Sequence, residues 1–362
     1  MGTRIGFLPA LVIALATAAA ARGQAVTPTE GPYKVIKSEK VGGAGGFDYV
    51  YADSAGRKLY IPRSNRVEVY NMDTLAHEGT IADANNVHGA AVDTASGHGF
   101  CSSRPVVMWD TSTLKPIKTI DVQGNPDGIF ADPSSGSIYV LSHSTPNVTV
   151  IDAKDGTVKG TIDIGGAPEQ GVADGAGHLY ICIENGAAIA VIDAKAMKMT
   201  GKYELGDNGG GPAGLSIDAK NRILFAYCRE HQICIVLNAD TGKILKTLPT
   251  GSGVDAAEFN PATMESFSSH GDGILTVIKE NSPTDFAVEQ QVQTKQGAKT
   301  STLDSKTNDI FLITADRAAP PAAASQPAEA VANGGRRGGR GGRGGRGGAM
   351  VPDSFTILVV GK

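Results

Sequence analysis

Cysteine, aromatic residues and long apolar runs are all scarce in this chain of 362 residues, which has four cysteines, one tryptophan and 6% aromatics. No two cysteines have the CxxC spacing of a zinc or redox site, and no CxxCH motif is present for covalent attachment of haem. The chain also lacks HExxH, a Ser-His-Asp signature and a phosphate-binding glycine motif. These absences weaken a self-contained redox role and favour binding over a defined catalytic chemistry.

The net charge is only −4, so a nucleic-acid function would have to rest on a local basic patch. The one long apolar run, IGFLPALVIALATAAA, follows the basic start MGTR and precedes small residues. This pattern predicts a removable signal peptide over residues 1–25 and a periplasmic or secreted bacterial protein, with an uncleaved anchor as the alternative. After removal of the signal we expect a monomer without a membrane span.

Four cysteines in an exported protein would meet oxidising conditions. Cys228 and Cys234 flank the short turn REHQ, which could bring them close enough to form a disulfide. The alternative is that all four cysteines are small buried residues on strands.

Glycine is abundant, at 47 residues, and the chain repeats a unit that is clearest over residues 124–165. This unit contains four apolar, β-branched runs, GIFAD, SIYVLS, NVTVID and VKGTIDI, with turn residues between them. Seven related units share a residue that ends the first run at a spacing of about 40 residues: Asp53, Asp93, Asp132, Asp174, Asp218, Asn260 and Asp304. We interpret this residue as a turn former and not as a ligand, because Asp before Gly, Ser or Asn caps local N–H groups.

A period of about 40 residues with four strands predicts an all-β, seven-bladed β-propeller of four-stranded blades over residues 33–362. The seventh unit is interrupted by an Ala/Pro-rich and then RGG-rich insertion over residues 318–350, which we expect to be disordered, and it resumes as SFTILVVGK without a fourth strand. The N-terminal segment YKVIKSEKV resembles the fourth-strand segments of other units. We therefore expect it to complete the last blade and close the ring.

The segments IYVLSHSTPNVTVID, LYICIENGAAIAVID and LYIPRSNRVEVYN resemble the repeats of the YVTN-repeat, or YncE-like, propellers. The resemblance covers roughly residues 33–317 and 351–362. It implies an exported bacterial propeller, but it carries over no catalytic motif. Related propellers include lactonases and quinoprotein or haem d1-type redox proteins.

Two classes of loop share one face of such a propeller: those leading into each innermost strand, and those between second and third strands. Lys299 and Glu184 fall in these loops, as do the side chains that we predict to bind a ligand at the channel: Asp48, His88, Asp127, Glu169, Gln170, Asp255, His143, Arg229 and His270. Carboxylates and imidazoles that converge could hold a divalent cation, for which we nominate His88, Asp127, Glu169 and Asp255. The alternative is a set of ordinary solvated loops.

The sequence therefore predicts an exported propeller that binds a small ligand, a metal ion or a partner protein at its channel face. A lactonase-like, metal-dependent hydrolase is one alternative. The other is a surface protein that binds polyanions through the insertion, whose arginines are Arg336, Arg337, Arg340, Arg343 and Arg346.

Overall fold

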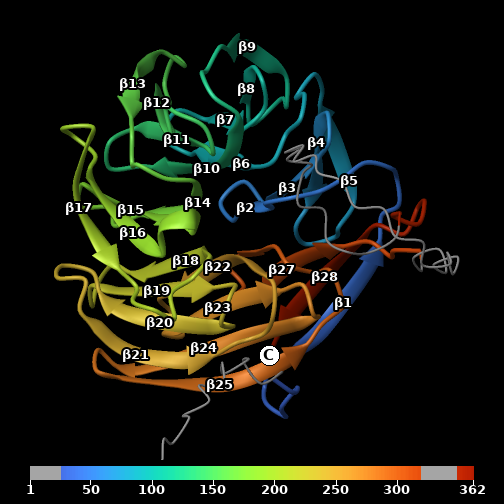
Figure 1. Cartoon of the computed structure of the whole chain (residues 1–362). Helices are drawn as coiled ribbons and strands as arrows, with labels where there is room; N and C mark the ends of the chain where they lie inside the picture. The colour runs from blue at the N-terminus through green and yellow to red at the C-terminus, as the bar shows by residue number, and fades with distance from the viewer. Residues whose placement is uncertain (1–25, 319–348) are drawn as a thin grey trace, which may run out of the picture.

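The computed structural model describes residues 26–318 and 349–362, and these residues form seven four-stranded antiparallel sheets arranged in a ring (Figure 1). The first strands of neighbouring blades lie against one another around the centre of the ring. The predicted seven-bladed propeller of four-stranded blades is confirmed, and its blades are numbered here in chain order.

Each of blades 1 to 6 is a run of four consecutive strands. From the innermost strand outward, blade 1 contains β2 (Tyr51–Asp53), β3 (Lys58–Arg63), β4 (Arg66–Asn71) and β5 (His77–Ile81), and blade 2 contains β6 (Ala90–Asp93), β7 (His98–Cys101), β8 (Val106–Asp110) and β9 (Pro116–Ile120). Blade 3 contains β10 (Pro126–Asp132), β11 (Ser137–Ser142), β12 (Val148–Asp152) and β13 (Val158–Ile162), and blade 4 contains β14 (Pro168–Ala173), β15 (His178–Ile183), β16 (Ala188–Asp193) and β17 (Lys198–Glu204). Blade 5 contains β18 (Pro212–Asp218), β19 (Ile223–Cys228), β20 (Ile233–Asn238) and β21 (Ile244–Pro249), and blade 6 contains β22 (Val254–Asn260), β23 (Glu265–His270), β24 (Ile274–Ser282) and β25 (Asp285–Gln293). Among the described residues the helical structure is the short 3₁₀ turn η1 (Glu184–Gly186), and no helix there is long and apolar enough to cross a membrane.

Blade 7 is assembled from both ends of the chain. Its strands are β26 (Ser301–Leu303), β27 (Ile310–Thr314), β28 (Thr356–Gly361) and, outermost, β1 (Lys34–Lys40). β1 pairs antiparallel with β28 from Lys34 opposite Gly361 to Lys40 opposite Thr356, and Figure 1 shows the blue β1 beside the red end of the chain. The predicted closure by the N-terminal strand is confirmed, and it protects the edge of β28 from pairing with another chain.

The insertion leaves and re-enters blade 7 at one place, because Arg317 and Met350 form an antiparallel bridge and Ala318 N donates to Ala349 O at 2.8 Å. The predicted signal peptide and the arginines of the insertion lie outside the described residues.

The middle strands are buried on both faces, since each blade is covered by the next blade on either side. All six residues of β11, SIYVLS, are buried, whereas four of the five residues of the outer β9, PIKTI, are exposed. Seven hydrophobic clusters fill the seven interfaces between neighbouring blades, including the interface between blades 7 and 1 around Phe355 and Ile61. The core is therefore a closed ring of interfaces.

The repeated Asp or Asn at the end of each first strand caps the turn that follows it, as predicted. In blade 1, Gly56 N donates to Asp53 Oδ1 at 2.8 Å, and in blade 7 Lys306 N donates to Asp304 Oδ1 at 3.0 Å. The other five blades have equivalent bonds. These side chains belong to the scaffold.

The possible disulfide between Cys228 and Cys234 does not form, and all four cysteines are free and buried. Cys234 pairs with Tyr227 across β19 and β20, so Cys228, the next residue along β19, faces the other side of the sheet. Cys228 accordingly packs between blades 4 and 5, and Cys234 between blades 5 and 6.

Candidate functional site

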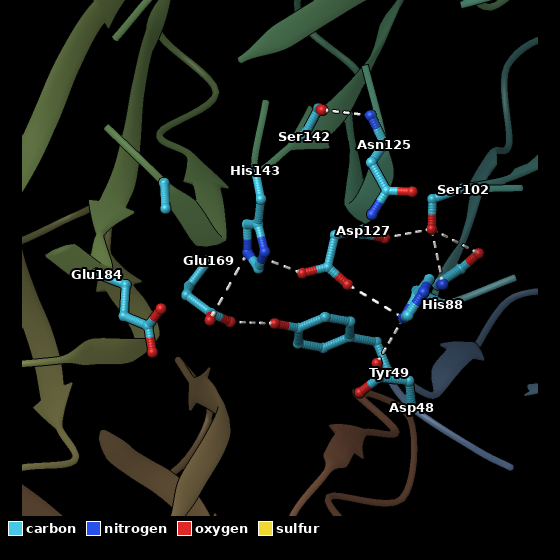
Figure 2. Close-up of polar contacts among 12 residues, drawn as sticks. Asp48, Tyr49, His88, Ser102, Asn125, Asp127, Ser142, His143, Glu169 and Glu184 are labelled. Carbon is cyan, nitrogen blue, oxygen red and sulfur yellow. Dashed lines mark hydrogen bonds and ion pairs between the residues drawn. The ribbon is translucent and has the colours of Figure 1, made fainter. Parts of the chain in front are cut away.

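Charged side chains from all seven blades, together with one tyrosine, meet on one face at the centre of the ring. We call them the central cluster: Asp48 and Tyr49 of blade 1, His88 of blade 2, Asp127 and His143 of blade 3, Glu169 and Glu184 of blade 4, Arg229 of blade 5, Asp255 of blade 6 and Lys299 of blade 7. Most of them come from the two loop classes that the sequence nominated, whereas Asp127, Glu169 and Asp255 lie at the start of an innermost strand. Figure 2 shows the part of the cluster around Asp127.

Three of the carboxylates are placed by irregular pairing at the start of an innermost strand. Asp127, Glu169 and Asp255 each lie inside a register shift between the first and second strands of their blade. Such a bulge turns a side chain away from the regular alternation of the strand. Blade 5 has the same shift but carries Ala213 there, and Arg229, from its loop between β19 and β20, supplies a charged group instead.

Asp127 lies between two imidazoles (Figure 2). Its Oδ1 is 3.2 Å from His88 Nδ1, and its Oδ2 is 3.1 Å from His143 Nε2. His88 Nδ1 is also 2.8 Å from Asp48 Oδ2, and His143 Nε2 is 3.8 Å from Glu169 Oε1. The result is a row in which carboxylates and imidazoles alternate.

Arg229 and Lys299 continue this row until it closes on itself. Arg229 Nη1 is 3.1 Å from Glu169 Oε1 and 2.8 Å from Glu184 Oε1, and Arg229 Nη2 bonds Asp255. Lys299 bonds the other oxygen of Asp255, and its Nζ is 3.7 Å from Asp48 Oδ1. Acidic and basic groups therefore alternate around a complete cycle at the centre of the ring.

Two hydroxyl groups fix the cluster in place. Tyr49 donates to Glu169 Oε2 at 2.9 Å, and Ser102 Oγ accepts from Gly89 N at 2.7 Å while donating to the carbonyl of Asp127 (Figure 2). Ser102 thus ties the main chain beside His88 to that of Asp127. The sequence interpretation named neither hydroxyl, because only their partners identify them.

The pKa values show how the cluster balances its charge. Hydrogen bonding to Asp127 raises the pKa of His143 to about 9, and hydrogen bonding to Asp48 raises the pKa of His88. Burial raises the pKa of Glu169 to about 7. Burial also opposes ionisation of Asp127, but the hydrogen bond from His143 and the charge of His88 hold its pKa below the usual value.

The structure also shows which nominated residues could hold a metal ion. Among the described residues, two groups have ligand atoms that all lie within 4.8 Å of one another: Asp48, His88 and Asp127, and Asp127, His143 and Glu169. Three of the four metal ligands nominated from the sequence, His88, Asp127 and Glu169, are in these groups. Asp255 is in neither group, and Asp48 and His143 belong to the groups instead.

Two of the residues that the sequence nominated for ligand binding make hydrogen bonds within the scaffold instead. Gln170 Oε1 accepts from Leu215 N and Ala257 N, both at 2.9 Å, and its Nε2 donates to Ala257 O, so it links the inner strands of blades 4, 5 and 6. His270 is fully buried with its Nε2 3.1 Å from Thr276 Oγ1, and burial lowers its pKa to about 3. The structure does not bring His270 to the central cluster.

Comparison with known proteins supports the fold alone. No family model matches the chain, and no curated protein matches it by sequence. A chain in the crystal structure of the mitotic checkpoint complex is similar, with a TM-score of 0.68 and 13% identity over 83% of this chain and 95% of that one. The resemblance to YVTN-repeat propellers therefore stays a prediction.

Proposed function

We propose that this protein is an exported, non-enzymatic binding propeller that holds a divalent cation at the central cluster. The observation that carries this proposal is the convergence of two histidines and three carboxylates, Asp48, Asp127 and Glu169, in two groups whose ligand atoms all lie within 4.8 Å of one another. Imidazole with carboxylate oxygen is a ligand set that suits ions such as Zn²⁺ and Mn²⁺.

The charge of the cluster also favours a cation. Five carboxylates (Asp48, Asp127, Glu169, Glu184 and Asp255) face two permanent cations, Arg229 and Lys299. Hydrogen bonds to Asp48 and Asp127, together with the negative charge of nearby carboxylates, raise the pKa values of His88 and His143, so that protonation of the imidazoles adds positive charge to the cluster. A divalent ion would supply it instead and would displace protons from the imidazoles.

The test is calorimetric titration of chelator-treated protein with Zn²⁺, Mn²⁺ and Ca²⁺. We expect saturable binding of at least one ion, with a rise in unfolding free energy of about 3 kcal/mol at a hundredfold excess over Kd. Asp127→Asn should remove the binding, whereas His77→Gln, at an exposed histidine of β5, should retain it. Absence of saturable binding in the wild type, or unchanged binding in Asp127→Asn, would contradict the proposal.

The two alternative functions separate in simple assays. Turnover of a panel of ester and lactone substrates, measured with and without chelator, tests the hydrolase, since chelator-sensitive turnover would show a catalytic role in place of a binding role.

Deletion of residues 334–348 tests polyanion binding through the insertion. It should leave cation binding unchanged, because none of the residues that define the central cluster belongs to the deleted segment.

A further inference from the structure

The two oxygens of Asp127 face different histidines. Oδ1 is 3.2 Å from His88 Nδ1 and Oδ2 is 3.1 Å from His143 Nε2. A carboxylate that turned both oxygens toward one imidazole could chelate a single ion. With one oxygen toward each imidazole, Asp127 has the arrangement of a carboxylate that bridges two ions.

Each side of Asp127 has two further candidate ligand atoms. On one side, His88 Nδ1 has Asp48 Oδ2 at 2.8 Å, and on the other, His143 Nε2 has Glu169 Oε1 at 3.8 Å. Neighbouring ligand atoms around a tetrahedral ion with bonds of about 2.0 to 2.1 Å lie about 3.3 Å apart. The observed distances fall on either side of that value, so small side-chain adjustments would close each group around an ion.

We propose that the central cluster binds two divalent cations bridged by the carboxylate of Asp127, one held with Asp48 and His88 and the other with His143 and Glu169. This inference rests on the proposed function and specifies its stoichiometry. Asp127 is the shared ligand. The other two carboxylates and the two imidazoles each serve one ion.

The charge of the cluster accommodates two ions. With five carboxylates set against Arg229, Lys299 and two divalent ions, and with both imidazoles neutral, the loaded cluster carries one net positive charge. Each ion has three protein ligands and keeps an open position. The pair therefore fits a ligand with an anionic oxygen, such as a carboxylate or phosphate group, that spans both ions.

The stoichiometry of bound Mn²⁺ tests the inference, measured by elemental analysis after equilibrium dialysis and by electron paramagnetic resonance. We expect two ions per wild-type chain, with the exchange-coupled spectrum of a close pair. Asp48→Asn and His143→Gln, whose wild-type side chains are 22% and 40% exposed, should each bind one ion with the spectrum of isolated Mn²⁺. Asp127→Asn should lose both ions.

The outcomes separate this inference from the proposed function. One ion at saturation in the wild type would overturn the bridged pair and leave cation binding intact. No ion would overturn both. Two ions without magnetic coupling, or two ions retained in Asp127→Asn, would place the ions elsewhere and overturn the bridge. The wild-type measurements decide the question even if a variant fails to fold.

Discussion

The hydroxyl of Tyr49 in blade 1 donates a 2.9 Å hydrogen bond to Glu169 Oε2 in blade 4, so two blades that are not neighbours are joined through the central cluster. Burial raises the pKa of Tyr49 well above its usual value, which keeps the hydroxyl protonated as a donor.

Replacing Tyr49 by Phe removes this hydrogen bond to a carboxylate. We expect Tyr49→Phe to lower the free energy of unfolding by about 1.5 to 3 kcal/mol, measured by urea denaturation above about pH 8, where Glu169, with its pKa of about 7, is ionised. Tyr203→Phe is the matched control, because Tyr203 donates to the neutral carbonyl of Ala239 and should cost about 0.5 to 1.5 kcal/mol. Equal losses in the two variants would argue against a special contribution from the Tyr49 contact.

Arg229 is the positive charge on which three carboxylates depend. Arg229→Met leaves Glu169, Glu184 and Asp255 without it, and we expect a loss of about 3 to 5 kcal/mol in unfolding free energy. Lys202→Met is the control, since it removes an exposed pair with Glu204 and should change stability by less than about 1 kcal/mol. A stable Arg229→Met protein would mean that the cluster does not need this cation.

Gln170 is expected to stabilise the ring without binding a ligand. Gln170→Leu deprives the N–H groups of Leu215 and Ala257 of their shared acceptor, and we expect a loss of about 2 to 4 kcal/mol. The stoichiometry of cation binding should not change. Loss of cation binding in a folded Gln170→Leu protein would instead show that Gln170 takes part in ligand binding.

His270 makes stability depend on pH. Its pKa in the folded protein is lowered to about 3, so between that pH and about 6.5 the unfolded chain binds a proton that the folded protein does not. The contribution of His270 is therefore complete above about pH 6.5 and is lost as the pH falls. Between pH 7 and pH 5 the loss is about 2 kcal/mol.

The measurement is urea denaturation of the wild type and His270→Asn across this range. The difference between the two profiles isolates His270 from the carboxylates, which titrate in both proteins. Parallel profiles for the wild type and His270→Asn would show that His270 is not held neutral.

The sequence by itself determined the scaffold. Three features were enough to predict seven blades and their closure. They are the turn-forming residue that recurs at Asp53 and its six equivalents, the apolar runs between turns, and the similarity of the N-terminal segment to the fourth strands of other blades. The repeated features are local, and blades 1 to 6 each satisfy them within about 40 residues, whereas blade 7 takes its outermost strand from the other end of the chain. The sequence also placed most of the residues of the central cluster, including His88, Asp127 and Glu169, on one face, because loop class follows from strand order.

Only the tertiary structure decided which of these side chains meet. Register shifts orient the side chains of Asp127, Glu169 and Asp255, and the alternation of residues along a strand does not predict these shifts. In blade 5, where Ala213 occupies the equivalent position, Arg229 supplies the charged group from the loop between β19 and β20. Tyr49 is recognised as part of the cluster only from its hydrogen bond to Glu169. His270, which the sequence nominated for the same face, is buried. Contacts across the ring join residues far apart in the sequence, so their geometry depends on the packing of all seven blades.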